Sequence, residues 1–313
     1  PEFCRRRHGG RVLDQPWRWI NANNQALGDW LKEVRAKLER REPIKLDALP
    51  SCVSVHTGQQ RTDIIRVCYD ILSKIHPNES VAVIGIANRV ESVHEIGRRL
   101  GGAYGVIEPI DSRDIKEVVE NLMDQCPFKK AMAVLEFAGM CFSGLSQSVL
   151  KTEYNALGKK RKPNRRVSTP ITSPLNELLI HNNLASVVMM IESLQKMPKT
   201  HLFRKELYYE TLRILKEALR VGEDLKTTAV RVRENTRKIG RRFGKRILAR
   251  TVLIKGLEFD HVIVLSADQF DRKNLYVALT RASKSIAIVS NSEELHHNNF
   301  MDSHTKPLAI EAV

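Results

Sequence analysis

The sequence predicts an α/β protein with a parallel sheet that is interrupted by an α-helical insertion. A buried strand at residues 80–86 is followed by an amphipathic helix at 89–100 and a strand at 104–107, the order of a parallel α/β unit. After Pro109 this alternation gives way to long helical segments, and it returns from Arg250. We therefore expect one α/β domain that an insertion divides.

The elements around the first strand each show their own periodicity. Apolar side chains recur at helical spacing over residues 63–75, which predicts an amphipathic helix. The strand at 80–86 is a short apolar run, typical of a buried strand. In the helix that follows it, one stripe carries Val90, Val93, Ile96 and Leu100.

Helical segments dominate the middle of the chain. They are expected at residues 114–123, 184–197 and 205–220. Residues 159–166 read Lys-Lys-Arg-Lys-Pro-Asn-Arg-Arg and have no apolar period, which predicts an exposed loop. This stretch is therefore predicted to be an α-helical insertion that carries a basic loop.

The α/β pattern resumes near the end of the chain. Its predicted elements are residues 251–254, a strand at 261–265, a helix near 273–282 and a strand at 285–290. Residues 293–313 are polar and His-rich without periodicity, and we expect an irregular tail there. The predicted domains are the first part of the α/β domain at 1–109, the basic helical insertion at 110–245, and the remainder of the domain at 246–313.

The formal net charge of +15 is concentrated in two short stretches. Basic residues outnumber acidic ones seven to one between Lys151 and Pro170, and ten to one between Lys226 and Arg250. A charge held in short stretches indicates contact with a polyanion, because a generally basic surface would spread it. The structural alternative is a solvated loop together with a solvated helix face.

The cysteines and the hydropathy of the sequence indicate in which cellular compartment the protein is expected. Five cysteines without a CxxC pair suit neither a disulfide framework nor a zinc site, which predicts free buried thiols, no bound metal and a reducing cytoplasm. No apolar run reaches the length of about eighteen residues that a membrane span needs, and no secretory signal is visible, so we expect no membrane partner. The chain begins at Pro1 without Met, and we expect it to be part of a longer protein.

Two segments in the last fifth of the chain carry motifs. Residues 251–260 read Thr-Val-Leu-Ile-Lys-Gly-Leu-Glu-Phe-Asp, and residues 274–282 read Asn-Leu-Tyr-Val-Ala-Leu-Thr-Arg-Ala. Gly256 lets the backbone approach a ligand closely, and its neighbours offer a phosphate contact (Lys255) and a hydroxyl acceptor (Glu258). Arg281 lies late in a helical segment, and its planar guanidinium suits the charge on a transferring phosphoryl group. The structural alternatives are a turn with solvated charges and a surface arginine in an ion pair.

These two segments resemble motifs V and VI of the superfamily 1 DNA helicases of the UvrD/Rep type. The resemblance implies a RecA-like fold of the P-loop NTPase type, in which this chain corresponds to the C-terminal motor domain with a helical insertion similar to domain 2B. It implies an ATP-dependent DNA helicase or translocase. Arg281 would be the arginine finger, and Gly256, Glu258 and Tyr276 would contact the nucleotide, whereas Thr251 and Lys255 would contact DNA.

Arg18 is the second catalytic candidate. The segment from Gln15 to Ile20 takes the place of helicase motif IV, where an arginine contacts the γ-phosphate, although Trp17 and Trp19 flank Arg18 where the family has Tyr and Ser. The structural alternative is an arginine stacked between two core indoles.

The departures from the family pattern concern ATP binding. The sequence contains no GxxxxGK[ST] string, since the nearest, Gly240–Arg246, has the wrong spacing and no hydroxyl after Lys245. It also has no DExx strand to hold Mg²⁺, and motif V lacks the His that many relatives place after its Thr. The resemblance therefore implies that an N-terminal RecA-like domain of the same protein binds most of the ATP and Mg²⁺, and that this chain alone is inactive.

The partners follow from the same resemblance and from the charge. Single-stranded or partly duplex DNA is expected to lie along a groove lined by Arg237, Arg241 and Arg242, which precede motif V and would contact phosphates. The alternative function is an ATPase-dead, helicase-related module that holds nucleic acid with its basic insertion. An unrelated soluble α/β protein is the remaining alternative.

Overall fold

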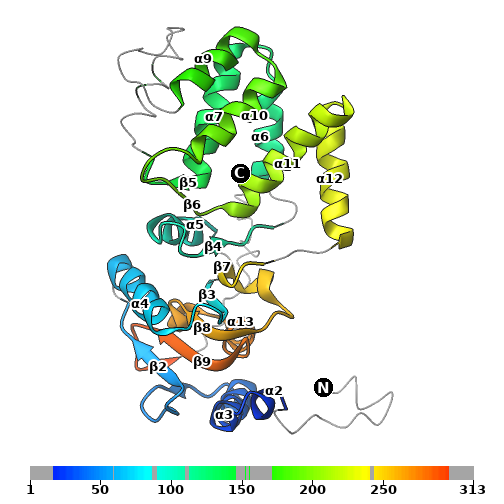
Figure 1. Cartoon of the computed structure of the whole chain (residues 1–313). Helices are drawn as coiled ribbons and strands as arrows, with labels where there is room; N and C mark the ends of the chain where they lie inside the picture. The colour runs from blue at the N-terminus through cyan, green and yellow to red at the C-terminus, as the bar shows by residue number, and fades with distance from the viewer. Residues whose placement is uncertain are drawn as a thin grey trace, which may run out of the picture. The chain divides into compact units, whose positions relative to one another are not determined.

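The computed structural model divides by its internal contacts into two compact units, drawn in Figure 1. One unit comprises residues 1–88 and 254–313, and the other comprises residues 89–253. Residues 89–109 and 246–253, which the sequence placed in the α/β domain, thus fall with the helical unit, and the bounds 110–245 of the insertion stay a prediction. The structure describes residues 17–58, 60–86, 90–109, 113–145, 152, 155, 171–239 and 243–295.

The first unit, which we call the motif unit because it carries most of both motifs, has a parallel sheet with helices around it. Its elements are α2 (Trp17–Asn21), α3 (Gln25–Arg40), β1 (Ile44–Lys45), β2 (Val53–His56), α4 (Arg61–Lys74), β3 (Val81–Gly85), β8 (Phe259–Val264), η2 (Ala267–Gln269), α13 (Arg272–Leu279), β9 (Ala282–Val289) and β10 (Glu294–Leu295).

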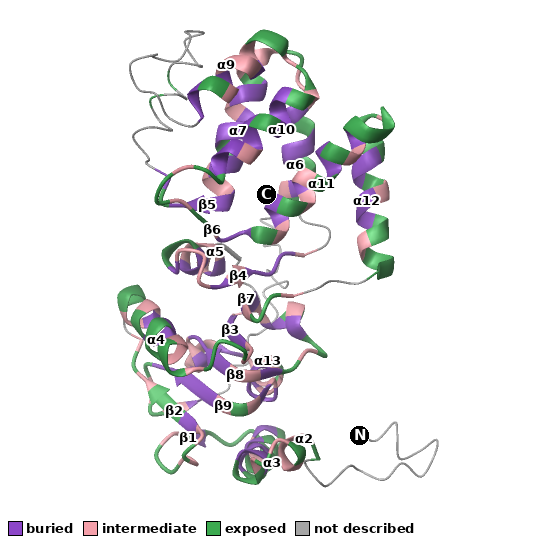
Figure 2. Ribbon diagram, viewed as in Figure 1, coloured by how far each residue is buried: buried purple, intermediate pink, exposed green. Residues whose placement is uncertain are grey.

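The sheet of the motif unit has the strand order β2-β9-β8-β3, and each neighbouring pair is parallel. Every residue of β3 is buried, as the apolar run at 80–86 predicted, and Figure 2 colours most of β8 as buried too. The predicted helix at 63–75 is confirmed as α4, which begins with a capping box between Gln60 and Asp63.

The second unit, the helical unit, is built mainly of helices with short strands. Its elements are α5 (Val90–Arg99), β4 (Gly105–Val106), α6 (Arg113–Leu122), α7 (Pro127–Cys141), β5 (Phe142–Ser143), α9 (Thr172–His181), α10 (Leu184–Leu194), β6 (His201–Leu202), α11 (Lys205–Val221), α12 (Leu225–Ile239), β7 (Arg246–Arg250) and the 3-10 helix η1 (Thr251–Ile254), which ends across the boundary.

The core of the helical unit lies among α6, α7, α9, α10, α11 and α12. Tyr208 of α11 is fully buried there, in aromatic contact with Phe137 and Phe142. The helices predicted at 114–123, 184–197 and 205–220 are confirmed as α6, α10 and α11. The predicted basic loop at 159–166 lies outside the described residues.

The strands of the helical unit include a parallel pair, β4 with β7. The six parallel strands of the two units and the surrounding helices confirm the predicted α/β class and fit a RecA-like fold. The α/β pattern resumes at β7, earlier than the predicted position at Arg250. The sequence did not indicate this strand because an arginine stands at each end of its short apolar run. The predicted element at 251–254 is the helix η1 instead of a strand.

Four cysteines are described, and all four are free thiols; two are buried as predicted, whereas Cys52 and Cys126 are half-buried. Cys68 and Cys141 are buried, and burial raises the pKa of Cys68 to about 12. None of the helices in the described ranges is long and apolar enough to cross a membrane.

Candidate functional site

The candidate site lies in the motif unit where α13 ends and β9 begins. The Asp271 side chain caps the start of α13 by accepting a hydrogen bond from the backbone N–H of Asn274 at 2.9 Å. At its other end, the Thr280 amide and hydroxyl both donate to the Tyr276 carbonyl, at 3.0 and 2.8 Å. This closed last turn fixes Arg281 between the helix and the strand.

Arg281 is held by neutral oxygen acceptors. Its Nε donates to the Val277 carbonyl at 2.9 Å, its Nη1 to the Leu257 carbonyl at 3.0 Å, and its Nη2 to the Thr280 hydroxyl at 3.0 Å. No salt bridge of Arg281 occurs within the described ranges. Burial, and then the nearby charge of Arg18, lower the pKa of Arg281. Its positive charge is therefore oriented and only weakly compensated.

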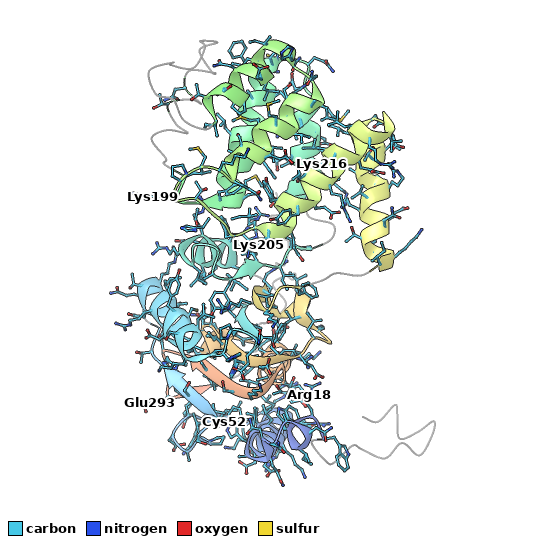
Figure 3. The ribbon with its side chains drawn as sticks, viewed as in Figure 1. Arg18, Cys52, Lys199, Lys205, Lys216 and Glu293 are labelled. Carbon is cyan, nitrogen blue, oxygen red and sulfur yellow. The ribbon has the colours of Figure 1, made fainter. Side chains whose placement is uncertain are left out.

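Arg18, labelled on α2 in Figure 3, reaches the same turn. Its Nη1 donates to the Thr280 carbonyl at 2.6 Å, and its Nη2 pairs with Glu258 Oε1 at 2.5 Å. Thr280 thus accepts hydrogen bonds from both guanidiniums, on its carbonyl and on its hydroxyl. The charge of Glu258 also acts on Arg281, whose pKa it raises. Two cations share this one carboxylate.

The helix α2 is anchored to the first residues of β9 by side-chain donors. Trp19 Nε1 donates to the Ala282 carbonyl at 2.8 Å, and Asn24 Nδ2 donates to the Lys284 carbonyl at 2.6 Å. The Arg18 guanidinium lies 5.4 Å from the Trp19 ring centre, whereas Trp17 is 56% exposed. Arg18 is therefore next to one indole and is not enclosed between two core indoles.

The loop before β8 carries the remaining motif V candidates of this unit. Gly256 has φ +85°, a conformation that residues with a side chain rarely adopt. The Lys255 side chain is exposed, and it makes no hydrogen bond or ion pair within the part of the chain that the structure describes. Within four residues the loop therefore offers an accessible backbone at Gly256, the cation of Lys255 and the carboxylate of Glu258.

Tyr276 of α13 lies close enough to Arg35 of α3 to act on its charge. The pKa of Arg35 is raised first by the hydrogen bond to Glu39 and also by Tyr276.

The structure brings some predicted site residues together and leaves others apart. Arg18, Glu258 and Arg281 converge, with Lys255, Gly256 and Tyr276 on the adjoining loop and helix. Thr251 is fully buried at the start of η1, and Arg237 is exposed near the end of α12, both in the helical unit. Arg241 and Arg242 lie outside the described residues. The predicted DNA groove therefore stays a prediction.

Two parts of the site were missing from the sequence analysis. Thr280 bonds both arginines, and Trp19 with Asn24 fixes α2. The string Leu-Thr-Arg contains Thr280, but its dual role depends on Arg18, far away in the sequence. In the described ranges, no cluster of three or more His, Cys, Asp or Glu side chains is suited to a metal ion.

The motif unit is a parallel α/β unit in which two arginines meet at the turn between α13 and β9. Residues 253–289 match the family model of the UvrD-like helicase C-terminal domain, which supports a UvrD/Rep-type helicase C-terminal region here. The match covers the loop with Gly256 and Glu258, α13 and β9, so it includes Arg281 but not Arg18. No curated protein matches the chain.

Proposed function

We propose that this chain is the C-terminal motor part of an ATP-dependent DNA helicase or translocase, in which Arg281 is the arginine finger. The observation that carries the proposal is the convergence of Arg281 and Arg18 on Thr280, with Glu258 as the shared counter-ion. Two oriented guanidiniums with one half-exposed carboxylate leave a net positive charge, which suits a polyphosphate. The family match covers the segment with Arg281.

The residues present fit a nucleotide phosphate group. Arg281 is fixed by three neutral acceptors, so little reorganisation is needed when negative charge develops in front of it. Arg18 would be the second contact, and an entering phosphate would replace Glu258 as its partner. Gly256 and Tyr276 would lie against the rest of the nucleotide. ATP with Mg²⁺ supplies the transferable phosphoryl group, and an N-terminal RecA-like domain would hold most of it.

DNA is the second partner in this proposal, and the cytoplasm is the compartment. Thr251 and Lys255 would contact a single strand, and the basic residues around Arg237 would attract its phosphates without reading sequence. The supports are the family match at 253–289 and the concentrated charge of the chain.

The purified chain should hydrolyse no ATP, because its sequence contains no GxxxxGK[ST] string to neutralise the β- and γ-phosphates. The measurement is phosphate release with and without single-stranded DNA. Turnover at helicase-like rates, unchanged by Arg281→Ala, would contradict the proposed division of labour between two motor domains.

A further inference from the structure

The helical unit contains a cavity of about 430 Å³ that no predicted site residue lines. It lies between the edge strand β4, the first turns of α11 and the residues that lead into β7. Its volume falls within the range of about 300–1,000 Å³ that small-molecule sites occupy. Apolar side chains form much of its wall, including Val106, Ile115 and Leu207.

Gly105 lines this cavity and, because it has no side chain, leaves space within it. A Cβ atom built on Gly105 would lie 3.6 Å from Lys205 Cδ and 3.8 Å from the Arg246 carbonyl oxygen, which are ordinary contacts with two other lining residues. A larger side chain at this position would therefore enter the cavity without forcing the backbone.

The acidic groups that line the cavity already have partners. Glu108 is buried against Arg204, with Nε–Oε1 and Nη2–Oε2 distances of 2.6 and 3.0 Å. Glu206 accepts a hydrogen bond from the Glu108 amide at 2.7 Å, and Glu210 pairs with Arg213 at 2.9 Å. These carboxylates are neutralised or bonded within the protein.

Two lining cations, in contrast, have no such partner. Lys205, labelled at the start of α11 in Figure 3, and Arg246 make no ion pair within the described ranges. Two aromatic residues, Tyr209 and Phe243, also line the cavity, and Tyr209 is 54% exposed. A planar apolar body could lie against these rings while an attached anion meets the cations.

We propose that this cavity binds one unstacked nucleotide of a single strand, with the base inside and its phosphate at Lys205 and Arg246. Aromatic faces accept any base by stacking, and cations hold the backbone. This inference rests on the proposed DNA-binding function, because a single strand presents unstacked bases together with their phosphates.

The test compares the binding of the full chain to oligothymidylate and to an abasic deoxyribose-phosphate chain of the same length, by fluorescence anisotropy. Gly105→Leu should weaken binding to oligothymidylate about five- to 150-fold, the range expected from loss of one stacked base, and leave the abasic chain unaffected. Gly139→Leu, a similar change where a Cβ meets no neighbour, is the matched control and should change neither.

Two surface variants keep the proposal testable if Gly105→Leu does not fold. Tyr209→Ala should weaken only the binding of oligothymidylate. Lys205→Ala should weaken both ligands and lower the log-log salt slope by about 0.7. If the wild-type chain binds neither ligand, both the proposed function and this site are wrong. If it binds both equally, or if the folded variants bind like wild type, the site alone is wrong.

Discussion

At the scale of single residues, the site depends on how one carboxylate is shared. Glu258 pairs directly with Arg18, and its charge also acts on Arg281. Its side chain is 52% exposed, so the ion pair contributes at most about 1 kcal/mol. Such a weak contact orients Arg18 but yields easily to a more highly charged anion.

Glu258→Gln should therefore strengthen the binding of inorganic pyrophosphate to the chain by up to about five-fold, since the competing carboxylate is gone. Isothermal titration calorimetry measures this affinity. Glu42→Gln is the control, because it removes a carboxylate from the exposed ion pair with Arg40. Weaker binding by the Glu258 variant than by wild type would mean that the carboxylate supports the anion site instead of competing for it.

The sequence singled out Arg281, Arg18 and Glu258 as candidates, but it did not indicate the contacts between them. Arg281 stands in a motif, and its bond to the Val277 carbonyl follows from helix spacing. The Arg18–Glu258 pair joins positions that are distant in sequence and that no periodicity relates. Only the fold, through the anchoring of α2 on β9, brings them together.

At the scale of elements, continuous apolar patterns were the dependable signal. The sequence predicted β3 because the strand is apolar throughout. It predicted α11 because apolar side chains form a stripe along one face of that helix. The helix α12 is absent from the predicted elements because its buried side includes Thr228 and Arg233, which do not read as apolar. β7 begins before the predicted position for a similar reason.

A polar cluster links three strands of the motif unit near their N-terminal ends. Asp260 of β8 accepts hydrogen bonds from the Ser80 amide and hydroxyl, both at 2.8 Å, and pairs with Lys284 of β9 at 3.0 Å. Burial alone would raise the pKa of Asp260, but the bonds from Ser80 and Lys284 outweigh it and lower this pKa to about 2.

This depressed pKa makes a pH-dependent contribution to stability. The contribution is present above the unfolded-state value of about 3.9 and is lost as pH falls toward 2. Asp260→Asn should therefore lower the free energy of unfolding at pH 7 and reduce its decline between pH 4 and pH 2. Urea unfolding across this range, with the exposed Asp47→Asn as control, measures the effect. An undiminished decline in the Asp260 variant would assign the acid sensitivity to other groups.

At the scale of the whole molecule, the chain carries one half of a proposed two-domain machine. The motif unit would supply cations to a nucleotide that another RecA-like domain holds, and the helical unit would supply contacts to a strand. This proposed division would account for a sequence in which residues 253–289 match the UvrD-like helicase C-terminal domain but no GxxxxGK[ST] string occurs.

The most direct test of this account is Arg281→Ala in a protein that joins this chain to an N-terminal RecA-like domain with a complete GxxxxGK[ST] string. The measurement is single-turnover ATP hydrolysis together with nucleotide affinity, and Lys32→Ala, which removes an exposed cation on α3, is the matched control. We predict that the hydrolysis rate falls by about 10³-fold or more, with a much smaller change in nucleotide affinity, as expected for an arginine that acts in the transition state. Hydrolysis by the Arg281 variant at the rate of the control would contradict the account.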